Sequence, residues 1–154
     1  MKSSIPYNYT PFNPVEKYTE VRKSEIHGFG LFAKKLIPKD TIWWHARPQD
    51  VLIITKDQFM TLEASYQQTN DFLLILVRYS YYDVYLDALI FCLDNSRYVN
   101  HSFDANSGTS EELALNAIAN RDIQVGEEIT EDYSRYSLGS WLQKYKPFFD
   151  PPCL

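Results

Sequence analysis

Three short runs of the sequence combine side-chain types and spacings that could support chemistry. In His27-Gly-Phe-Gly-Leu-Phe-Ala33, the paired glycines let the backbone approach a bound molecule closely. The run Asp94-Asn-Ser-Arg-Tyr-Val-Asn-His-Ser102 supplies amide, imidazole and hydroxyl groups that can grip a polar ring or an amine. Arg121-Asp-Ile-Gln-Val-Gly-Glu-Glu-Ile-Thr-Glu-Asp-Tyr133 predicts a hairpin with an acidic rim. Taken alone, the first two runs are also typical of a glycine-rich turn and a polar turn.

Several familiar kinds of site do not fit these runs. The first run lacks the third glycine and the following helix of a dinucleotide-binding fingerprint. No Gly-x-Ser-x-Gly elbow supports a serine hydrolase built around His101. The two cysteines, Cys92 and Cys153, form no zinc-binding spacing with the histidines His27, His45 and His101. We therefore expect no metal in the site.

Length and charge narrow the functions further. A chain of 154 residues with 45% hydrophobic residues predicts one domain with its own core. The net charge of -5 argues against direct binding of nucleic acid and is compatible with a basic partner. The longest strongly apolar run, Phe72–Val77, is too short to cross a bilayer, so we expect no membrane association. An N-terminus without an apolar secretion signal, together with few cysteines, favours an intracellular protein, cytoplasmic or nuclear.

Short apolar segments separated by turn residues must position the three runs, which predicts a mainly β fold with a few short helices. The predicted strands are 21–23, 31–33, 36–42 with a turn at 38–40, 51–54, 85–93, 113–119 and 128–132. Thr55 and Gln58 fit a capping box, which predicts a helix after Thr55. Phe59, Leu62 and Tyr66 then recur at helical spacing. The segment 72–82 fits either a strand or a buried helix.

The order and spacing of the three runs are more specific than any one of them. Gly-x-Gly-Leu-Phe-Ala, Arg-Tyr-Val-Asn-His-Ser and Gly-Glu-Glu-Ile-Thr-x-Asp-Tyr together resemble the SET domain family, which are S-adenosyl-L-methionine-dependent protein lysine methyltransferases. Residues 37–42, 92–94 and 119–123 support the resemblance between the runs. The resemblance divides the chain into an irregular extension (1–16), the SET domain (17–136, with a variable insert at about 55–85) and a C-terminal segment (137–154).

This resemblance implies both a fold and a site. The fold is a SET-domain β-fold of small sheets with a C-terminal pseudoknot, which brings residues near 100 and near 133 together. The cofactor S-adenosyl-L-methionine is expected on Gly28, Phe29, Gly30, Asn100 and His101. Tyr133 is expected to be the catalytic tyrosine of the methyl-transfer channel. The remaining channel positions are assigned to Trp44, Tyr81, Tyr82 and Tyr136.

Residues of these types suit the implied chemistry. Methyl transfer from a sulfonium to an amine is an in-line displacement that depends mainly on positioning. The lysine amine must be neutral, although its usual pKa of about 10.4 keeps it charged at neutral pH. A narrow aromatic channel disfavours the charged form by desolvation, and the sulfonium adds like-charge repulsion. The expected substrate is a lysine-bearing protein or peptide, and the net charge of -5 favours a basic one, histone-like or ribosomal.

The sequence departs from the family pattern at the channel. Trp44 stands where many members have a tyrosine, and an indole offers one donor but no hydroxyl acceptor. Phe103-Asp-Ala-Asn106 replaces the usual Cys-x-Pro-Asn and keeps only its asparagine. These departures leave open a catalytically inactive SET-fold module for protein interaction, or methylation of a small amine or a non-lysine residue. The part of the channel wall that the family tyrosine would form is expected from one of the tyrosines of the insert, Tyr79, Tyr81, Tyr82 or Tyr85.

The C-terminal segment has no counterpart of the zinc-binding cysteine clusters that flank many histone-directed members. It is predicted to open with a short helix near Trp141 and to break at its prolines, Pro147, Pro151 and Pro152. Its aromatic residues could close the lysine channel; they are Trp141, Tyr145, Phe148 and Phe149. Ordinary packing of a folded-back tail explains the same residues equally well.

Overall fold

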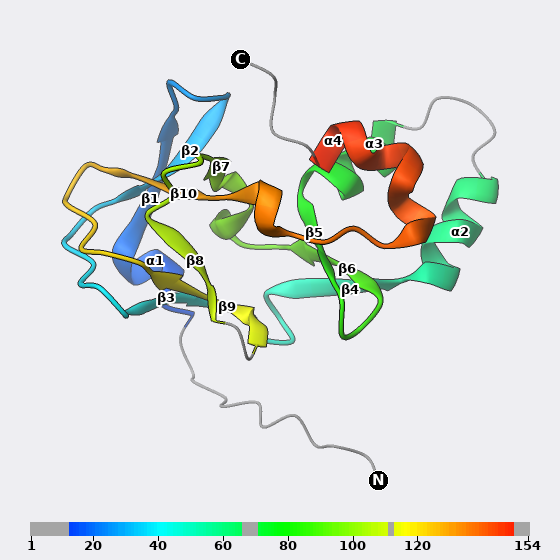
Figure 1. Ribbon diagram of the computed structural model, residues 1–154, viewed down its shortest axis with the longest axis horizontal. Helices are drawn as coiled ribbons and strands as arrows, with labels where there is room; N and C mark the ends of the chain where they lie inside the picture. The colour runs from blue at the N-terminus through cyan, green and yellow to red at the C-terminus, as the bar shows by residue number, and fades with distance from the viewer. Residues whose placement is uncertain (1–12, 66–70, 111–112, 150–154) are drawn as a thin grey trace, which may run out of the picture.

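The computed structural model describes residues 13–65, 71–110 and 113–149 (Figure 1). The larger sheet contains β1 (Thr19–Lys23), β2 (Phe29–Ala33), β3 (Ile42–His45), β7 (Asn100–His101), β8 (Ser107–Ser110), β9 (Leu113–Ala119) and β10 (Glu128–Glu131). Its strand order is β1-β2-β10-β8-β9-β3, and β7 pairs with β10 beside this path. The smaller sheet has the order β4-β6-β5 and contains β4 (Val51–Thr55), β5 (Ser80–Asp83) and β6 (Ala88–Cys92).

Short helices connect and flank the two sheets. The α-helices are α1 (Val15–Tyr18), α2 (Lys56–Ser65), α3 (Asp71–Arg78) and α4 (Lys146–Phe149). The 3-10 helices are η1 (Asn95–Tyr98), η2 (Tyr133–Arg135) and η3 (Ser140–Tyr145). None of the described helices is both long and apolar enough to cross a membrane. The mainly β fold class predicted from the sequence is thus confirmed.

Strand β10 is inserted between segments that lie far away in the sequence. It runs antiparallel to β2, where Ile129 lies opposite Leu31. It runs parallel to β7, where Thr130 lies opposite Asn100, and parallel to β8. The chain between β7 and β8 therefore loops around β10, which confirms the pseudoknot. Residues near 100 and near 133 meet at this crossing.

Two apolar clusters fill the interior. The first joins the larger sheet to residues of β4 and β6 and includes the fully buried Leu31 and Ile129 together with Trp43. The second lies between the smaller sheet, the insert helices and the C-terminal segment, and includes Phe59 and Leu142. In Figure 1 the C-terminal segment, orange to red, runs from the larger sheet to the side of α2 and α3. The tail is thus built into the second cluster.

The insert folds for local reasons that the sequence partly reveals. The capping box is present, because the Gln58 N–H donates to Thr55 Oγ1 (3.2 Å) and the Thr55 N–H donates to Gln58 Oε1 (2.9 Å). The ambiguous segment 72–82 divides into helix α3 and strand β5. Leu73, Leu76 and Val77 recur at helical spacing and are buried against the second cluster, which explains the helix. Tyr66 lies outside the described residues.

Several predicted boundaries were wrong. The strand predicted over 85–93 begins only at Ala88, because Asp83 Oδ1 accepts the N–H groups of Tyr85 and Leu86 and forms a turn. The strand predicted to reach Asp132 ends at Glu131. In the strand predicted over 36–42, Ile37 forms only an isolated bridge, and the observed strand β3 starts at Ile42.

Both chain ends also differ from the sequence prediction. Helix α1 spans the predicted boundary at 16, and residues 1–12 lie outside the described part. Pro147 does not break the tail but lies in the first turn of α4, where its missing N–H removes no helical hydrogen bond. The short helix predicted near Trp141 is present as η3. The other two prolines, Pro151 and Pro152, lie outside the described residues.

The buried position of Leu142 predicts that the tail contributes to global stability. Leu142→Ala should lower the free energy of unfolding by about 2–5 kcal/mol, because it leaves a cavity in the second cluster. Urea unfolding followed by circular dichroism measures the change. Val125→Ala, at a site with 66% exposure, is the control and should change stability by less than about 0.5 kcal/mol. A small effect of Leu142→Ala would exclude the tail from the cooperative core.

Candidate active site

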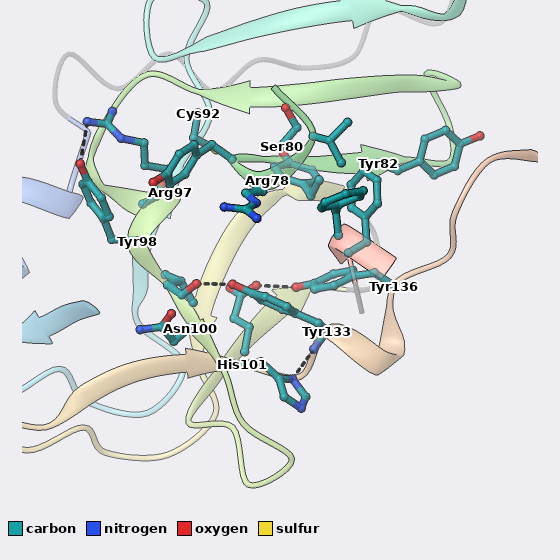
Figure 2. Close-up of a pocket in the computed structure, with 18 of the residues that line it drawn as sticks. Arg78, Ser80, Tyr82, Cys92, Arg97, Tyr98, Asn100, His101, Tyr133 and Tyr136 are labelled. Carbon is teal, nitrogen blue, oxygen red and sulfur yellow. Dashed lines mark hydrogen bonds between the residues drawn. The ribbon is translucent and has the colours of Figure 1, made fainter. Parts of the chain in front are cut away.

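A cavity of about 660 Å³ lies where the pseudoknot meets the smaller sheet and the tail (Figure 2). Nine of the ten residues assigned from the sequence line it: Gly28, Phe29, Trp44, Tyr81, Tyr82, Asn100, His101, Tyr133 and Tyr136. Gly30 is buried and is not among the lining residues. The fold thus brings the expected cofactor residues and the expected channel residues to one cavity.

The glycine segment is shaped by one left-handed residue and one amide side chain. Gly28 has a φ of 51°, a conformation that favours glycine, and its carbonyl accepts the N–H of Ser24 (3.0 Å). The side-chain nitrogen of Asn100 lies within hydrogen-bond distance of the carbonyls of His27 (3.2 Å) and Phe29 (3.0 Å). Asn100 therefore holds the backbone of the glycine segment against β7.

Glu128 joins this segment to β10. Its carboxylate accepts from Ser24 Oγ (2.8 and 2.9 Å) and from Asn100 Nδ2 (2.7 Å). The two N–H bonds of the Asn100 amide are thus shared among three acceptors. A Cβ at Gly30 would lie 2.2 Å from Glu128 Oε1. Gly30 is therefore required by the packing of the glutamate, and its expected contact with cofactor stays a prediction.

Asn106 fixes the other side of β10. Its buried amide donates to the Glu128 carbonyl (2.7 Å) and to Glu127 Oε1 (3.0 Å), and its Oδ1 accepts the Thr130 N–H (2.9 Å). Hydrogen bonding from Arg121 lowers the pKa of Glu127 to about 2. The asparagine retained after the Asn-His-Ser run thus binds the pseudoknot together.

His101 presents an unused polar atom to the interior. Its Nδ1 accepts the Tyr133 N–H (3.1 Å), which assigns the proton of the neutral ring to Nε2. Nε2 is buried and has no hydrogen-bond partner among the described residues. Phe103 packs edge-on against the imidazole, with ring centroids 4.5 Å apart. A buried unpaired donor in a cavity wall is the kind of group that a ligand satisfies.

Tyr133 and Tyr136 face the same space, and Figure 2 shows Arg78 across the cavity from them. The Tyr133 hydroxyl donates to the Val99 carbonyl, and burial raises the pKa of this phenol. The Tyr136 hydroxyl donates to Glu131 Oε2 (2.5 Å). Both phenols are therefore held in fixed orientations and stay protonated at neutral pH.

Trp44 and Tyr81 form another part of the wall. The Trp44 indole donates to Asp94 Oδ2 (2.8 Å), and its ring meets Tyr81 edge-on with centroids 6.4 Å apart. The Tyr81 hydroxyl is buried without a described partner, and burial raises its pKa well above the usual value. The indole donor is thus already used, whereas the buried Tyr81 hydroxyl has no partner among the described residues.

The other tyrosines of the insert contribute less. The Tyr82 hydroxyl donates to Asp87 Oδ1 (2.7 Å), and this hydrogen bond raises its pKa to about 12. Its ring also packs against Trp141, so Tyr82 offers the cavity an aromatic surface and no free hydroxyl. Tyr85 is 79% exposed and lies outside the lining, whereas Tyr79 belongs to it.

The tail packs into the core and also lines the cavity, while closure of a lysine channel by its aromatic residues stays a prediction. Trp141 and Tyr145 pack on Phe59, each with ring centroids 5.4 Å apart, which is ordinary core packing. Phe148 and Phe149 line the cavity. The same short segment therefore stabilises the insert and closes one wall.

A sequence profile of the SET domain matches residues 28–134, which is most of the chain. The chain belongs to the SET domain family. No curated protein sequence matches it.

Solved structures of SET proteins share the fold. Neurospora DIM-5, a histone lysine methyltransferase, is 19% identical with a TM-score of 0.53, over 81% of this chain and 56% of that one. Cryptosporidium CpSET8 is 22% identical with a TM-score of 0.54, over 77% and 58%. A ctPRC2 structure bound to S-adenosylmethionine is 20% identical with a TM-score of 0.59, over 84% and 16%. The chain therefore spans little more than half of the first two structures and a small part of the third, and these identities establish the fold alone.

Sequence reasoning missed several residues of this SET domain site. Glu128 was visible only as part of the Gly-Glu-Glu run, and nothing local predicted its bonds to Ser24 and Asn100. Arg78 was hidden in the segment that fits either a strand or a helix. Glu131 could have been found from the sequence. Its carboxylate stands at the end of a predicted strand, directly after the buried residues Ile129 and Thr130.

The depressed pKa of Glu127 predicts an acid-dependent stabilisation of the SET domain. A carboxyl whose folded pKa is about 2 stabilises the fold above its usual value near 4.5 and loses this effect as the pH falls toward 2. Glu127→Gln should therefore be less stable than wild type at pH 7, by about 1 kcal/mol for a partly exposed group. The difference should disappear between pH 4.5 and 2.

Urea unfolding at several pH values between 7 and 2 measures this difference. Val125→Ala, which changes no titratable group and lies at a site with 66% exposure, is the control and should show no such pH dependence. A constant difference between wild type and Glu127→Gln across the range would contradict an electrostatic origin.

Proposed function

We propose that this SET domain is an S-adenosyl-L-methionine-dependent protein lysine methyltransferase. The observation that carries the proposal is the single cavity shared by the glycine segment, the Asn-His strand and the tyrosines of β5 and η2. Membership of a methyltransferase family supports it, as does the related fold described as bound to S-adenosylmethionine.

The cavity fits the proposed cofactor. Its volume of about 660 Å³ lies in the range that accepts a molecule of this size. The polar groups expected around it are the backbone of Gly28 and Phe29, the Asn100 amide and the unpaired Nε2–H of His101. When bound, S-adenosyl-L-methionine supplies a methyl group on a positively charged sulfur.

The residues of the chain would then orient and desolvate the lysine amine. Trp44, Tyr81 and Tyr136 surround the space next to Tyr133 with aromatic surface, which excludes water and disfavours a charged amine. The hydroxyl of Tyr81 and the Val99 carbonyl can accept the amine hydrogens and set its direction. Positioning of this kind lowers the barrier by several kcal/mol, up to about 7–11 in the best cases.

The proposed substrate is a lysine in a basic protein or peptide, histone-like or ribosomal. The net charge of -5 supports this choice, as does the likeness to DIM-5, a histone lysine methyltransferase. An intracellular location, cytoplasmic or nuclear, belongs to the same proposal. The second candidate, an inactive interaction module, is favoured by Trp44, whose only polar group is bound to Asp94.

Cofactor binding is the first test. Calorimetric titration should give saturable binding of S-adenosyl-L-methionine to wild type. The binding should weaken at least tenfold in Asn100→Ala, which releases the glycine segment, and in His101→Ala, which removes the free donor. Gln124→Ala, on the exposed turn before β10, is the control and should bind as wild type does. Absence of binding at millimolar cofactor would favour the interaction module.

Tyr133→Phe tests the channel. The variant should lose at least 100-fold in methylation of a histone or ribosomal protein mixture with labelled cofactor, because the amine loses an oriented hydroxyl at its wall. Its cofactor affinity should stay within about threefold of wild type. Tyr85→Phe makes the same substitution at an exposed site and should leave turnover unchanged. Methylation at the wild-type rate by Tyr133→Phe would remove this residue from the mechanism.

A further inference from the structure

The cavity contains one carboxylate among its aromatic walls. Glu131 ends β10, lies opposite His101 and Ser107 in the sheet, and lines the cavity. Its neighbours in the wall include Tyr133 and Tyr136. An acidic side chain at this depth needs a reason, because transferring a carboxylate from water to an apolar site is unfavourable.

The described neighbours of Glu131 compensate its charge only in part. Oε2 accepts from the Tyr136 hydroxyl (2.5 Å), and Oε1 lies 3.5 Å from Ser107 Oγ. Two neutral hydroxyls are weaker partners for a carboxylate than a cation is. Within the described part of the chain, Glu131 forms no ion pair. Tyr81, whose hydroxyl has no partner among the described residues, lines the same cavity.

The electrostatic consequences agree with this geometry. Burial raises the pKa of Glu131, and its negative charge helps to raise the pKa values of Tyr81, Tyr133 and Tyr136. An entering cation that carries hydrogen-bond donors would compensate the charge of Glu131 and donate to its carboxylate oxygens. A lysine ammonium, with three N–H groups, meets these requirements.

We propose that Glu131 binds the ammonium group of the target lysine and accepts its proton before methyl transfer. This inference rests on the proposed methyltransferase function and names a residue for its proton step.

The step balances without any further reactant. One N–H bond of the ammonium breaks, its electron pair stays on nitrogen, and an O–H bond forms on the Glu131 carboxylate. The neutral amine uses that electron pair to form the new N–C bond, while the pair of the broken C–S bond stays on sulfur. After the product leaves, Glu131 releases its proton to water. No group is oxidised or reduced by the protein.

Other titratable and charged groups face the same cavity. They are the phenols of Tyr79, Tyr81, Tyr82, Tyr98, Tyr133 and Tyr136, the Cys92 thiol, the imidazoles of His27 and His101, and the cations Arg78, Arg97 and Lys146. Burial raises the pKa of Cys92 to about 12, so the thiol stays neutral below that pH. Because Glu131 also raises the pKa values of Tyr81, Tyr133 and Tyr136, Glu131→Gln is compared with Glu131→Asp, which keeps the negative charge.

The dependence of kcat/KM on pH tests the proton step. Wild type uses the charged lysine directly, so its kcat/KM should be flat between the pKa of Glu131 and the pKa of lysine, about 10.4. Glu131→Gln keeps an oxygen acceptor for Tyr136 but needs an amine already neutral in solution. Its kcat/KM should be about 100-fold lower or more at pH 7 and should rise about tenfold per pH unit. Glu131→Asp should restore the flat profile. Parallel profiles of wild type and Glu131→Gln would overturn the proposal.

Binding of an amine probe separates this proposal from the methyltransferase function itself. n-Butylammonium, which mimics the lysine side chain, is titrated into the protein without cofactor by calorimetry at pH 7. Glu131→Gln should bind it at least tenfold more weakly than wild type, and Glu20→Gln should bind it equally well. If wild type binds the amine through Glu131 but methylates nothing, the proposed function fails and the assignment of Glu131 as the ammonium site stands. Equal binding by wild type and Glu131→Gln, or no binding by wild type, overturns the assignment.

Discussion

The insertion of β10 between β2 and the β7–β8 loop is the constraint on which the whole site depends. Glu128 accepts hydrogen bonds from Ser24 and Asn100, while Asn106 binds the backbone of β10. Each of these buried or half-buried polar groups is satisfied by a residue from another segment, so the loss of one leaves its partners unpaired. The glycine segment, the Asn-His strand and Tyr133 therefore acquire their relative positions in one event, the closure of the pseudoknot.

The C-terminal segment adds a second constraint of a different kind. It is held by aromatic packing of Trp141 and Tyr145 on Phe59. Polar contacts add to this packing, because Tyr145 and Lys144 both bind Glu63 and the Trp141 indole donates to Asp87. Apolar contacts are non-directional and tolerate varied sequences, so such a segment can differ widely among proteins with the same central fold. Because the tail also supplies Phe148 and Phe149 to the cavity, its packing on the insert sets the shape of the far wall.

Local signals predicted much of this structure, and long-range pairing explains what they missed. The Thr55–Gln58 capping box and the ordered motifs led to helix α2 and to the pseudoknot. The sequence alone does not explain why position 30 is a glycine. A side chain there would collide with the carboxylate of Glu128, which belongs to a strand far away in the sequence. The orientation of Tyr82 depends in the same way on Asp87 beyond its strand and on Trp141 in the tail. The spacing of motifs in the sequence predicts which residues line the cavity. Hydrogen-bond partners from other segments determine which polar atoms of those residues remain without a partner.

Two glutamates on the same short stretch of chain show how surroundings separate structural from chemical roles. Glu127 accepts hydrogen bonds from Arg121 and Asn106, which lower its pKa to about 2. Its charge therefore serves to stabilise the fold. Glu131, four residues later, meets two hydroxyls in an aromatic cavity, and burial raises its pKa. A buried carboxyl with a raised pKa inside a cavity is a feature of sites that move protons. The pseudoknot fixes the strand that carries Glu131, and the lysine ammonium that we propose there would compensate the charge of its carboxylate.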